Sequence, residues 1–529
     1  MNGTNPMKTI KLTMGLLLAF FFLGGESLQA AGGKELPGFV LQELAHLAET
    51  YRILDLAAEK IWPGWTNYRD FPFLFEYQNG LRVLIGHPVP PGEFEKLADV
   101  RVENKDVYAD FSHLSTRQLA PPLFAGGGPL PFGTTKEGKP VTTVMMNFMS
   151  IDILKKGGYG IIKGPYSVEL QILCYIHELF HCFQNDHIKR DRVGNLRFNP
   201  DSPFAIYSEI EGQALLRAYK ARNRQEAEAF IRDFLAARAL KRKTGFPEEQ
   251  QKQESSDELS EGTAVYTSMR TLEILGAGYE SKLDLSKDTY YSGFKKAAYF
   301  ENGYVDQLKA SSEEIYDPIG KSYDYGCFQA LLLERYYPGW QKIFSTEISS
   351  LNKELAKRIP VDEKELPAYE KRFREIYGLD RIQARCSEAI RKRDDAYHSL
   401  MSRRGMSYIL NIKEVNQYEN QLMEGAPLDK LGLINMYMEG TPAVKLDQSE
   451  ISRISVPVEG NQLYYLKIVD TSWKSGQKPY SISFRAQDGS VYEDAVVTTP
   501  LFTLKTSRVR IDESSGRVKF TLLPVMKKD

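Results

Sequence analysis

The stretch at residues 168–183, VELQILCYIHELFHCF, decides how this sequence is interpreted. Apolar side chains occupy most of its positions, which is typical of a helix that is buried nearly all round. Ser167 precedes it and is of a residue type that caps helix N-termini. A buried helix must provide partners for its polar side chains, and this one carries His177, Glu178 and His181.

These three residues form the pattern H-E-x-x-H. Positions i and i+4 of a helix lie one above the other, so both imidazoles can bind the same ion. Zinc accepts such nitrogen ligands at about 2.0–2.1 Å, and a catalytic zinc site keeps one position for water. Glu178 is placed to accept a proton from that water. We therefore predict one Zn²⁺ ion on His177 and His181, with Glu178 as the general base.

Three residues are candidates for the third protein ligand: His187, Glu211 and Glu261. His187 stands where H-E-x-x-H-x-x-G-x-x-H would place a third histidine. Gln184 replaces the glycine of that motif, and left-handed backbone costs a non-glycine residue about 1–2 kcal/mol. Glu211 and Glu261 each lie on a predicted helix and are followed by small residues that permit close helix packing. The residues themselves leave these two carboxylates as near equals.

A family resemblance separates them. Residues 259–266, LSEGTAVY, resemble the N-E-G-x-A-x-Y segment of aminopeptidase N-like gluzincins, with Ser260 in place of Asn. Residues 323–326, YDYG, resemble the Y-x-x-G of the same enzymes. The resemblance implies that Glu261 is the third zinc ligand, with Glu211 as the alternative. It also implies that Tyr323 stabilises the oxyanion, a role that Tyr325 could take instead.

More narrowly, the chain resembles the bacterial peptidase MA-like proteins. The shared features are the WPGW segment at 62–65, Gln184 after the metal helix, the EGQA helix segment at 211–214 and the PGW segment at 338–340. The G-x-M-E-N segment with which aminopeptidase N binds a free amine has no counterpart. The sequence therefore leaves aminopeptidase and endopeptidase activity both open.

Hydrophobic periodicity outlines the rest of the chain. Further helices are predicted at 41–60, 208–241, 259–275, 326–336 and 363–393, and strands at 71–77, 81–85 and 141–148. The Gly- and Pro-rich run 121–133 and the polar run 243–256 are predicted loops. From about residue 409, short alternating runs separated by turn residues predict a β-rich domain. The predicted class is α+β: a mostly helical zincin-like domain, a small preceding sheet and a β-rich C-terminal domain.

The N-terminus has the layout of a secretory signal. Basic residues at 7–11 precede an apolar run at 12–23, and residues 28–30, LQA, could be read by a signal peptidase. We predict a signal peptide at 1–30, the N-terminal α/β part of the peptidase domain at 31–165, the helical zinc domain at 166–408 and the β-rich domain at 409–529. The expected location is periplasmic or extracellular, with no membrane span once the signal is removed.

Composition and cysteine content limit the class of protein, its partners and its disulfide bonds. Hydrophobic residues make up 42% and charged residues 26%, which is ordinary for a soluble globular protein. A formal net charge of -1 gives no reason to expect a nucleic-acid partner. Four Cys cannot form a disulfide scaffold in a chain of 529 residues. Cys174 and Cys182 are too far apart on one helix to bridge, whereas pairing of Cys327 with Cys386 stays open.

The function predicted from these observations is an exported zinc metallopeptidase that acts on peptides or proteins. The strand at 141–148 precedes the metal helix, where gluzincins place an edge strand that pairs with extended substrate. The alternative is a catalytically silent peptidase-fold binding protein of the cell envelope. Substrate preference, the role of the C-terminal domain and the oligomeric state are left open by the sequence.

Overall fold

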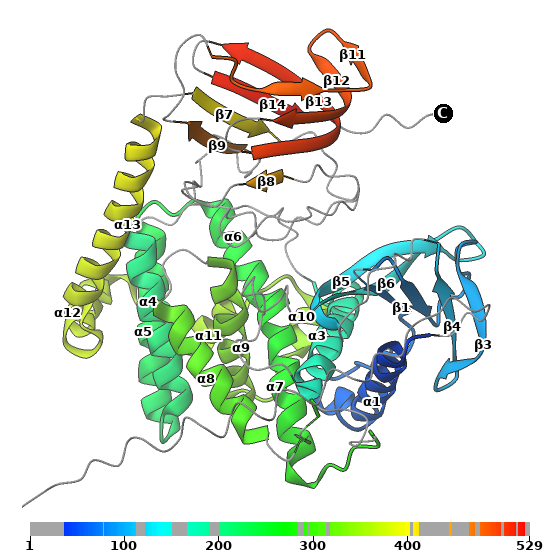
Figure 1. Ribbon diagram of the computed structural model, residues 1–529. Coiled ribbons are helices and arrows are strands. Elements are labelled where there is room, and N and C mark those ends of the chain that lie inside the picture. The colour runs from blue at the N-terminus through cyan, green and yellow to red at the C-terminus, as the bar shows by residue number, and fades with distance from the viewer. Residues whose placement is uncertain are drawn as a thin grey trace, which may run out of the picture.

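The computed structural model describes most of the chain from residue 36 to residue 523 (Figure 1). The described residues are 36–77, 79–112, 122–150, 167–189, 202–283, 290–291, 293–294, 297–313, 318–402, 406–411, 444–446, 465–470, 477–498, 502–514 and 517–523. The protein belongs to the α+β class, with one sheet before the main group of helices and another after it. The predicted signal peptide at 1–30 lies outside the described residues.

The first sheet follows a long helix and has six strands in the order β3-β4-β2-β1-β6-β5. Its elements are α1 (Gly38–Ile61), β1 (Phe73–Tyr77), β2 (Arg82–Ile85), β3 (Glu95–Val102), β4 (Lys105–Asp110), β5 (Pro122–Thr134) and β6 (Pro140–Ser150). Only β1 and β6 are parallel neighbours; the other pairs are antiparallel. The predicted strands at 71–77, 81–85 and 141–148 correspond to β1, β2 and β6.

The predicted loop at 121–133 is wrong, because these residues form β5 at one edge of the sheet. Pro129 and Pro131 made the segment resemble a loop, but an edge strand accommodates proline where the missing N–H would have faced outward. The prediction that the strand at 141–148 is an edge strand is wrong for the same reason. β6 lies between β1 and β5, so β5 takes the edge position beside it.

The helical part follows. Its elements are α3 (Val168–His187), α4 (Ser202–Lys220), α5 (Arg224–Lys243), α6 (Glu248–Asp257), η1 (Glu258–Gly262), α7 (Thr263–Leu275), η2 (Gly276–Gly278), α8 (Ala297–Glu313), α9 (Pro318–Tyr336), α10 (Lys342–Thr346), α11 (Leu351–Arg358), η4 (Glu363–Glu365), α12 (Leu366–Tyr377) and α13 (Leu379–Ser402). Ser167 caps α3 as predicted, since its hydroxyl accepts a hydrogen bond from the N–H of Leu170 at 3.2 Å. α3 contacts α1, α7, β5 and β6, which explains why it is apolar on most faces.

Four predictions in the helical part need correction. The single helix predicted at 208–241 is two helices, since Asn223 caps the start of α5 by accepting from the N–H of Glu226. The loop predicted at 243–256 contains most of α6. The helix predicted at 363–393 is divided into η4, α12 and α13, because Gly378 adopts left-handed backbone and ends α12. The helix predicted from Gly326 begins already at Pro318. Proline suits the first position of a helix because its missing N–H would be unpaired there in any case.

The second sheet contains β7 (Met406–Asn411), β8 (Val444–Leu446), β9 (Tyr465–Asp470), β10 (Ser481–Ser483), β11 (Ala486–Asp488), β12 (Val491–Thr498), β13 (Phe502–Ser514) and β14 (Arg517–Leu522). Its main path runs β10-β12-β13-β14-β7-β9, with β11 on β12 and β8 on β13. The β-rich character predicted from residue 409 onward is therefore present. It begins slightly earlier, at Met406.

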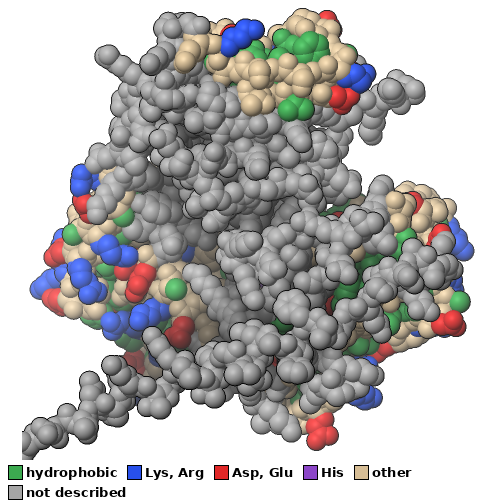
Figure 2. All heavy atoms as spheres, viewed as in Figure 1, with side chains coloured by type: hydrophobic (Ala, Val, Ile, Leu, Met, Phe, Trp, Pro, Cys, Tyr) green, Lys and Arg blue, Asp and Glu red, His purple; other side chains and the backbone are tan. Residues whose placement is uncertain are grey.

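The four cysteines carry free thiols, so Cys327 and Cys386 are not paired. No helix among the described residues has both the length and the apolarity needed to cross a bilayer. On the face drawn in Figure 2, acidic and basic side chains are interspersed over the described surface, as the small net charge leads one to expect.

Candidate metal centre

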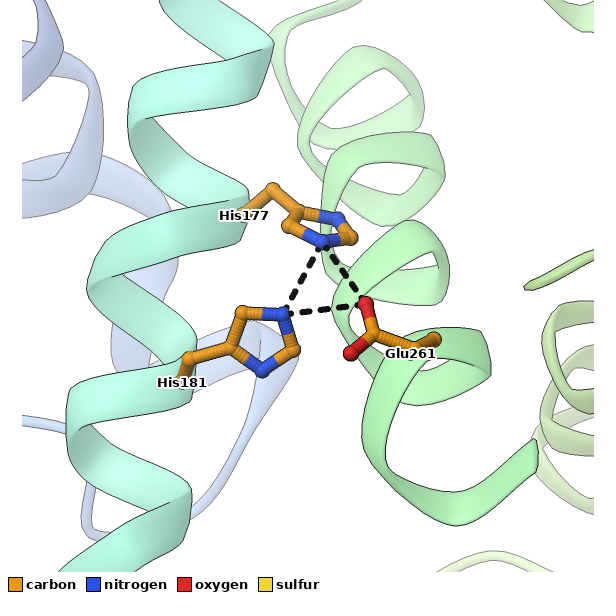
Figure 3. Close-up of side chains that lie close together, drawn as sticks. All are labelled: His177, His181 and Glu261. Carbon is orange, nitrogen blue, oxygen red and sulfur yellow. Dashed lines mark hydrogen bonds and ion pairs between the residues drawn. The ribbon is translucent and has the colours of Figure 1, made fainter. Parts of the chain in front are cut away.

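Three side chains from two separate elements point into one space (Figure 3). His177 and His181 project from the same face of α3, and Glu261 projects from η1. The Nε2 atoms of the two histidines lie 3.0 Å apart. Oε2 of Glu261 lies 3.2 Å from Nε2 of His181 and 3.4 Å from Nε2 of His177. The helical spacing therefore brings the two imidazoles together as expected, and Glu261 completes a triangle of donor atoms.

The size of this triangle can be compared with a metal site. Ligands at about 2.0–2.1 Å from a tetrahedral zinc ion are separated from one another by about 3.3 Å. The three observed separations, from 3.0 to 3.4 Å, lie close to that value. Two imidazole nitrogens and one carboxylate oxygen are also a donor set that catalytic zinc uses, with a fourth position left for water. The residues present therefore fit one zinc ion.

The three side chains of the triangle differ in exposure. The two histidines are buried, whereas the Glu261 side chain retains 26% of its exposure. Partial exposure of one ligand candidate is compatible with a catalytic site, which must admit water and substrate. The three donors thus lie at a boundary between the core and solvent.

Glu261 owes its position to an unusual turn. η1 is a single π-helical turn between α6 and α7, and such turns occur frequently at functional sites. A π turn contains more residues than an α turn, so side chains three residues apart diverge more strongly. Glu258 and Glu261 are three apart: Glu258 meets Arg238, while Glu261 meets the two histidines.

η1 packs directly against α9, backbone to backbone. A Cβ added to Gly262 would lie 2.5 Å from the carbonyl carbon of Gly326 and 2.8 Å from the N of Cys327. A Cβ on Gly326 would in turn overlap the carbonyl oxygen of Glu258. Both positions therefore require glycine because of close approach, and the contact places α9 beside the candidate metal ligands.

His181 and Glu261 shift each other's pKa values in favour of the charged forms. Burial alone would lower the pKa of His181, but the Glu261 carboxylate and the hydrogen bonds raise it to about 9. Burial alone would raise the pKa of Glu261, but His181 and His177 bring it well below the usual value. In the metal-free protein Glu261 is thus an anion, which is the form that binds a cation.

Glu178 lies next to His177 on α3 and is buried. Burial raises the pKa of its carboxyl group; the two histidines act in the opposite direction and Glu261 adds to the increase. A carboxylate with a raised pKa is a better proton acceptor near neutral pH than an ordinary surface glutamate. This is the property that the predicted general base requires.

Tyr323 lies over the same site. Its ring is stacked on that of His177, with ring centroids 6.1 Å apart and an angle of 5° between the planes. Burial raises the pKa of its phenol, and the carboxylates of Glu261 and Glu178 raise it further, so the O–H stays protonated and can donate. Tyr323 lies within α9 rather than before it, because the helix begins at Pro318. Tyr325 is directed elsewhere: its hydroxyl donates to the carbonyl oxygen of Ser208 at 2.6 Å.

The structure does not bring the other ligand candidates to the histidines. Glu211 is fully buried between Arg238 and Lys241, which lie 2.8 Å from its carboxylate oxygens. Burial would raise its pKa, but those two cations lower it to about 2. His187 remains in the last turn of α3, where its ring packs on Phe183. Since α3 continues through His187 instead of turning back, the third histidine has no route to the site.

The WPGW segment at 62–65 and the PGW segment at 338–340 lie together on one side of α3. Phe180 stands between the two histidines in the motif, and its ring lies 5.0 Å from the rings of both Trp62 and Trp65. Trp340 lies 5.2 Å from Trp62 and 5.6 Å from Tyr266. The WPGW and PGW segments therefore form an aromatic support against α3.

Two functional contacts were missed by sequence reasoning. Gln184 hydrogen-bonds to His181, a contact that its place in the family resemblance does not reveal. Arg238 holds Glu258 of the π turn, and no local pattern marks it. The spacing of Gln184, one helical turn after His181, is the signal that could have identified the first.

Comparison of the chain with protein-family models, with curated proteins and with solved structures finds no match.

Proposed function

We propose that the protein is an exported zinc-dependent metallopeptidase of the gluzincin type, with a zincin-like catalytic domain. The observation that carries this proposal is the triangle of His177, His181 and Glu261, whose donor separations match those of a zinc site. Glu178 and Tyr323 beside that triangle supply the acid–base and hydrogen-bonding groups of peptide hydrolysis. The signal-like segment at residues 7–30 supports export.

His177, His181 and Glu261 would hold the ion. When bound there, zinc supplies Lewis-acid polarisation of the scissile carbonyl and acidifies water. Glu178 accepts a proton from the attacking water and later passes it to the leaving amine. Its burial and raised pKa favour both transfers near neutral pH.

Tyr323 serves the carbonyl oxygen of the substrate. As the amide carbon becomes tetrahedral, negative charge develops on that oxygen, and a phenolic O–H directed at it lowers the barrier. The raised pKa of Tyr323 keeps this proton on the phenol throughout the working pH range. The contact between Gly262 and Gly326 keeps α9, and with it Tyr323, close to the ligand turn.

The substrate is an extended peptide or protein segment. β5 is the edge strand next to the metal helix, and α3 packs against both β5 and β6. An extended peptide adds to such an edge through main-chain hydrogen bonds. β5 replaces the strand at 141–148 in this role, because β6 is already paired on both sides.

Two measurements test the proposal. Purified protein should contain one equivalent of zinc, and it should cleave a mixed peptide library in a manner abolished by a chelator and restored by zinc. Glu178→Gln should retain zinc while hydrolysis falls roughly a hundred- to ten-thousandfold, because a proton acceptor is lost without loss of a ligand. Absence of zinc binding would refute the metal site, and equal hydrolysis by both proteins would refute the mechanism. Zinc binding without hydrolysis in the wild type would favour the silent binding protein.

A further inference from the structure

We infer that Gln184 is a positioning residue of the metal centre, which orients His181 and ties it to the turn that carries Glu261. This inference rests on the proposed function, since it concerns the same zinc site. Gln184 follows His181 by one helical turn and lies on the same face of α3. Its side-chain amide makes three hydrogen bonds, one to each of three groups around the ligands.

The first hydrogen bond fixes the imidazole. Oε1 of Gln184 lies 2.7 Å from Nδ1 of His181. An amide oxygen only accepts, so Nδ1 carries the proton and donates. Nε2 of the neutral ring is then left with its lone pair, and this is the atom that faces Glu261 and His177. Gln184 therefore selects the tautomer and the ring orientation that a metal ion requires.

The other two bonds reach across to η1. Nε2 of Gln184 donates to the carbonyl oxygen of Ser260 and to the hydroxyl of Thr263, both at 2.8 Å. The Thr263 hydroxyl donates in turn to the carbonyl oxygen of Leu259 at 2.5 Å. These contacts bracket Glu261, because Ser260 precedes it directly and Thr263 follows two residues later. The π turn is thus anchored to the metal helix on both sides of the ligand.

The residue type matters as much as the position. Reversing the amide would place its oxygen against the carbonyl of Ser260, two acceptors together, so only one orientation satisfies every partner. Glutamate would keep the acceptor for His181 but lose the donors, and leucine would lose both. Gln184 is also fully buried, so water cannot replace its bonds when the side chain is changed.

Zinc affinity of the metal-free full-length protein, measured by competition with a chromophoric chelator, tests this role without any substrate. Gln184→Leu should weaken zinc binding roughly 10- to 100-fold and alter the visible spectrum of the cobalt-substituted protein. Gln171→Leu is the matched control, because Gln171 is also a buried glutamine of α3 with hydrogen bonds to Glu43 and Tyr175, away from the ligands. Its zinc affinity and cobalt spectrum should stay those of the wild type.

The possible outcomes distinguish failure of the positioning role of Gln184 from failure of the zinc site itself. If the wild type binds zinc and a folded Gln184→Leu protein binds it equally well, the positioning role is wrong while the zinc site stands. Equal losses in both glutamine variants would overturn it too, since they would reflect general loosening of α3. If the wild type binds no zinc, the proposed function and this inference fail together.

Thr263→Val keeps the test valid if Gln184→Leu does not fold. Valine has nearly the shape of threonine and removes only the hydroxyl that joins Gln184 to Leu259. A loss of a few-fold in zinc affinity is expected, smaller than for Gln184→Leu because the Ser260 bond remains. No loss at all in a folded Thr263→Val protein would overturn the claim that this bracket positions Glu261.

Discussion

Replacing Gly262 with alanine tests whether contact with α9 holds the ligand turn in place. The added Cβ would lie 2.5 Å from the carbonyl carbon of Gly326, where ordinary contacts are 3.4–4 Å. The two backbones must therefore separate by about 1 Å, since neither has a flexible side chain that could move aside. Glu261 is the preceding residue and must move with the turn.

The magnitude follows from two opposing effects. Alanine favours helical backbone over glycine by about 0.5–1 kcal/mol, whereas overpacking in a tight interior costs typically 1–3 kcal/mol. Because backbone meets backbone, we take the upper part of that range and expect a net loss of about 2 kcal/mol in the free energy of unfolding. A ligand displacement near 1 Å should also weaken zinc binding or turnover by about a hundredfold.

Denaturant unfolding of the metal-free protein and chelator competition measure the two effects. Gly303→Ala is the control, because Gly303 is an exposed residue within α8 whose added Cβ would meet nothing within 4 Å. That variant should gain about 0.5–1 kcal/mol and keep its zinc affinity. If Gly262→Ala behaves like Gly303→Ala, the contact between η1 and α9 does not determine the position of Glu261.

Three further predictions concern the side chains around the site. Tyr323→Phe should lower kcat roughly 10²- to 10³-fold with zinc affinity unchanged, because only an O–H donor is lost. Steady-state kinetics measure the first effect and chelator competition the second. An unaltered kcat would remove Tyr323 from the mechanism. Glu211→Gln should lower the free energy of unfolding by roughly 3–5 kcal/mol, since Arg238 and Lys241 lose a buried counter-charge. That variant should retain zinc, whereas Glu261→Gln should lose more than roughly a hundredfold in zinc affinity. The reverse ranking of zinc affinities would make Glu211 the ligand. In the metal-free protein the folded pKa of His181 is about 9 against an ordinary 6.5, so its contribution to stability, up to about 3 kcal/mol, is complete below pH 6.5 and is lost as the pH rises through 9. Unfolding titrations between pH 6 and 10 should therefore show the stability of the wild type declining relative to that of His181→Gln. The comparison of the two proteins is required because buried Lys321, whose pKa is lowered to about 8, changes the stability of both in the opposite direction over this range.

The parts of the site that could be predicted from sequence are those set by local geometry. His177, Glu178 and His181 lie within one turn of helix, so their relation follows from helical spacing alone. The choice between Glu211 and Glu261 as the third ligand does not follow from local geometry. It depends on Arg238 and Lys241, which follow Glu211 by 27 and 30 residues and give it a different partner. Only the resemblance of residues 259–266 to a segment of a known family favoured Glu261 in advance.

The fold likewise contains features that a local sequence signal predicts and features that depend on contacts distant in sequence. The break between α4 and α5 had a readable signal, because Asn223 accepts from the N–H of Glu226 while the Glu226 carboxylate accepts from the N–H of Arg222. This reciprocal arrangement resembles a capping box, a pattern that marks the start of a helix. β5 had no such signal. Its glycines and prolines are typical of a loop, and only pairing with β6 makes the segment a strand.

The ligand turn is held from three sides, and this bears on how the site would bind its ion. Gln184 anchors η1 from the metal helix, Gly326 of α9 packs against it, and Arg238 bonds to both carboxylate oxygens of Glu258 from behind. Arg238 can be buried there because Glu211 provides a second counter-charge. Glu211, the ligand candidate that lies away from the histidines, therefore supports the turn that carries Glu261. A turn restrained in this way needs little reorganisation when a cation arrives, so most of the binding free energy remains available as affinity.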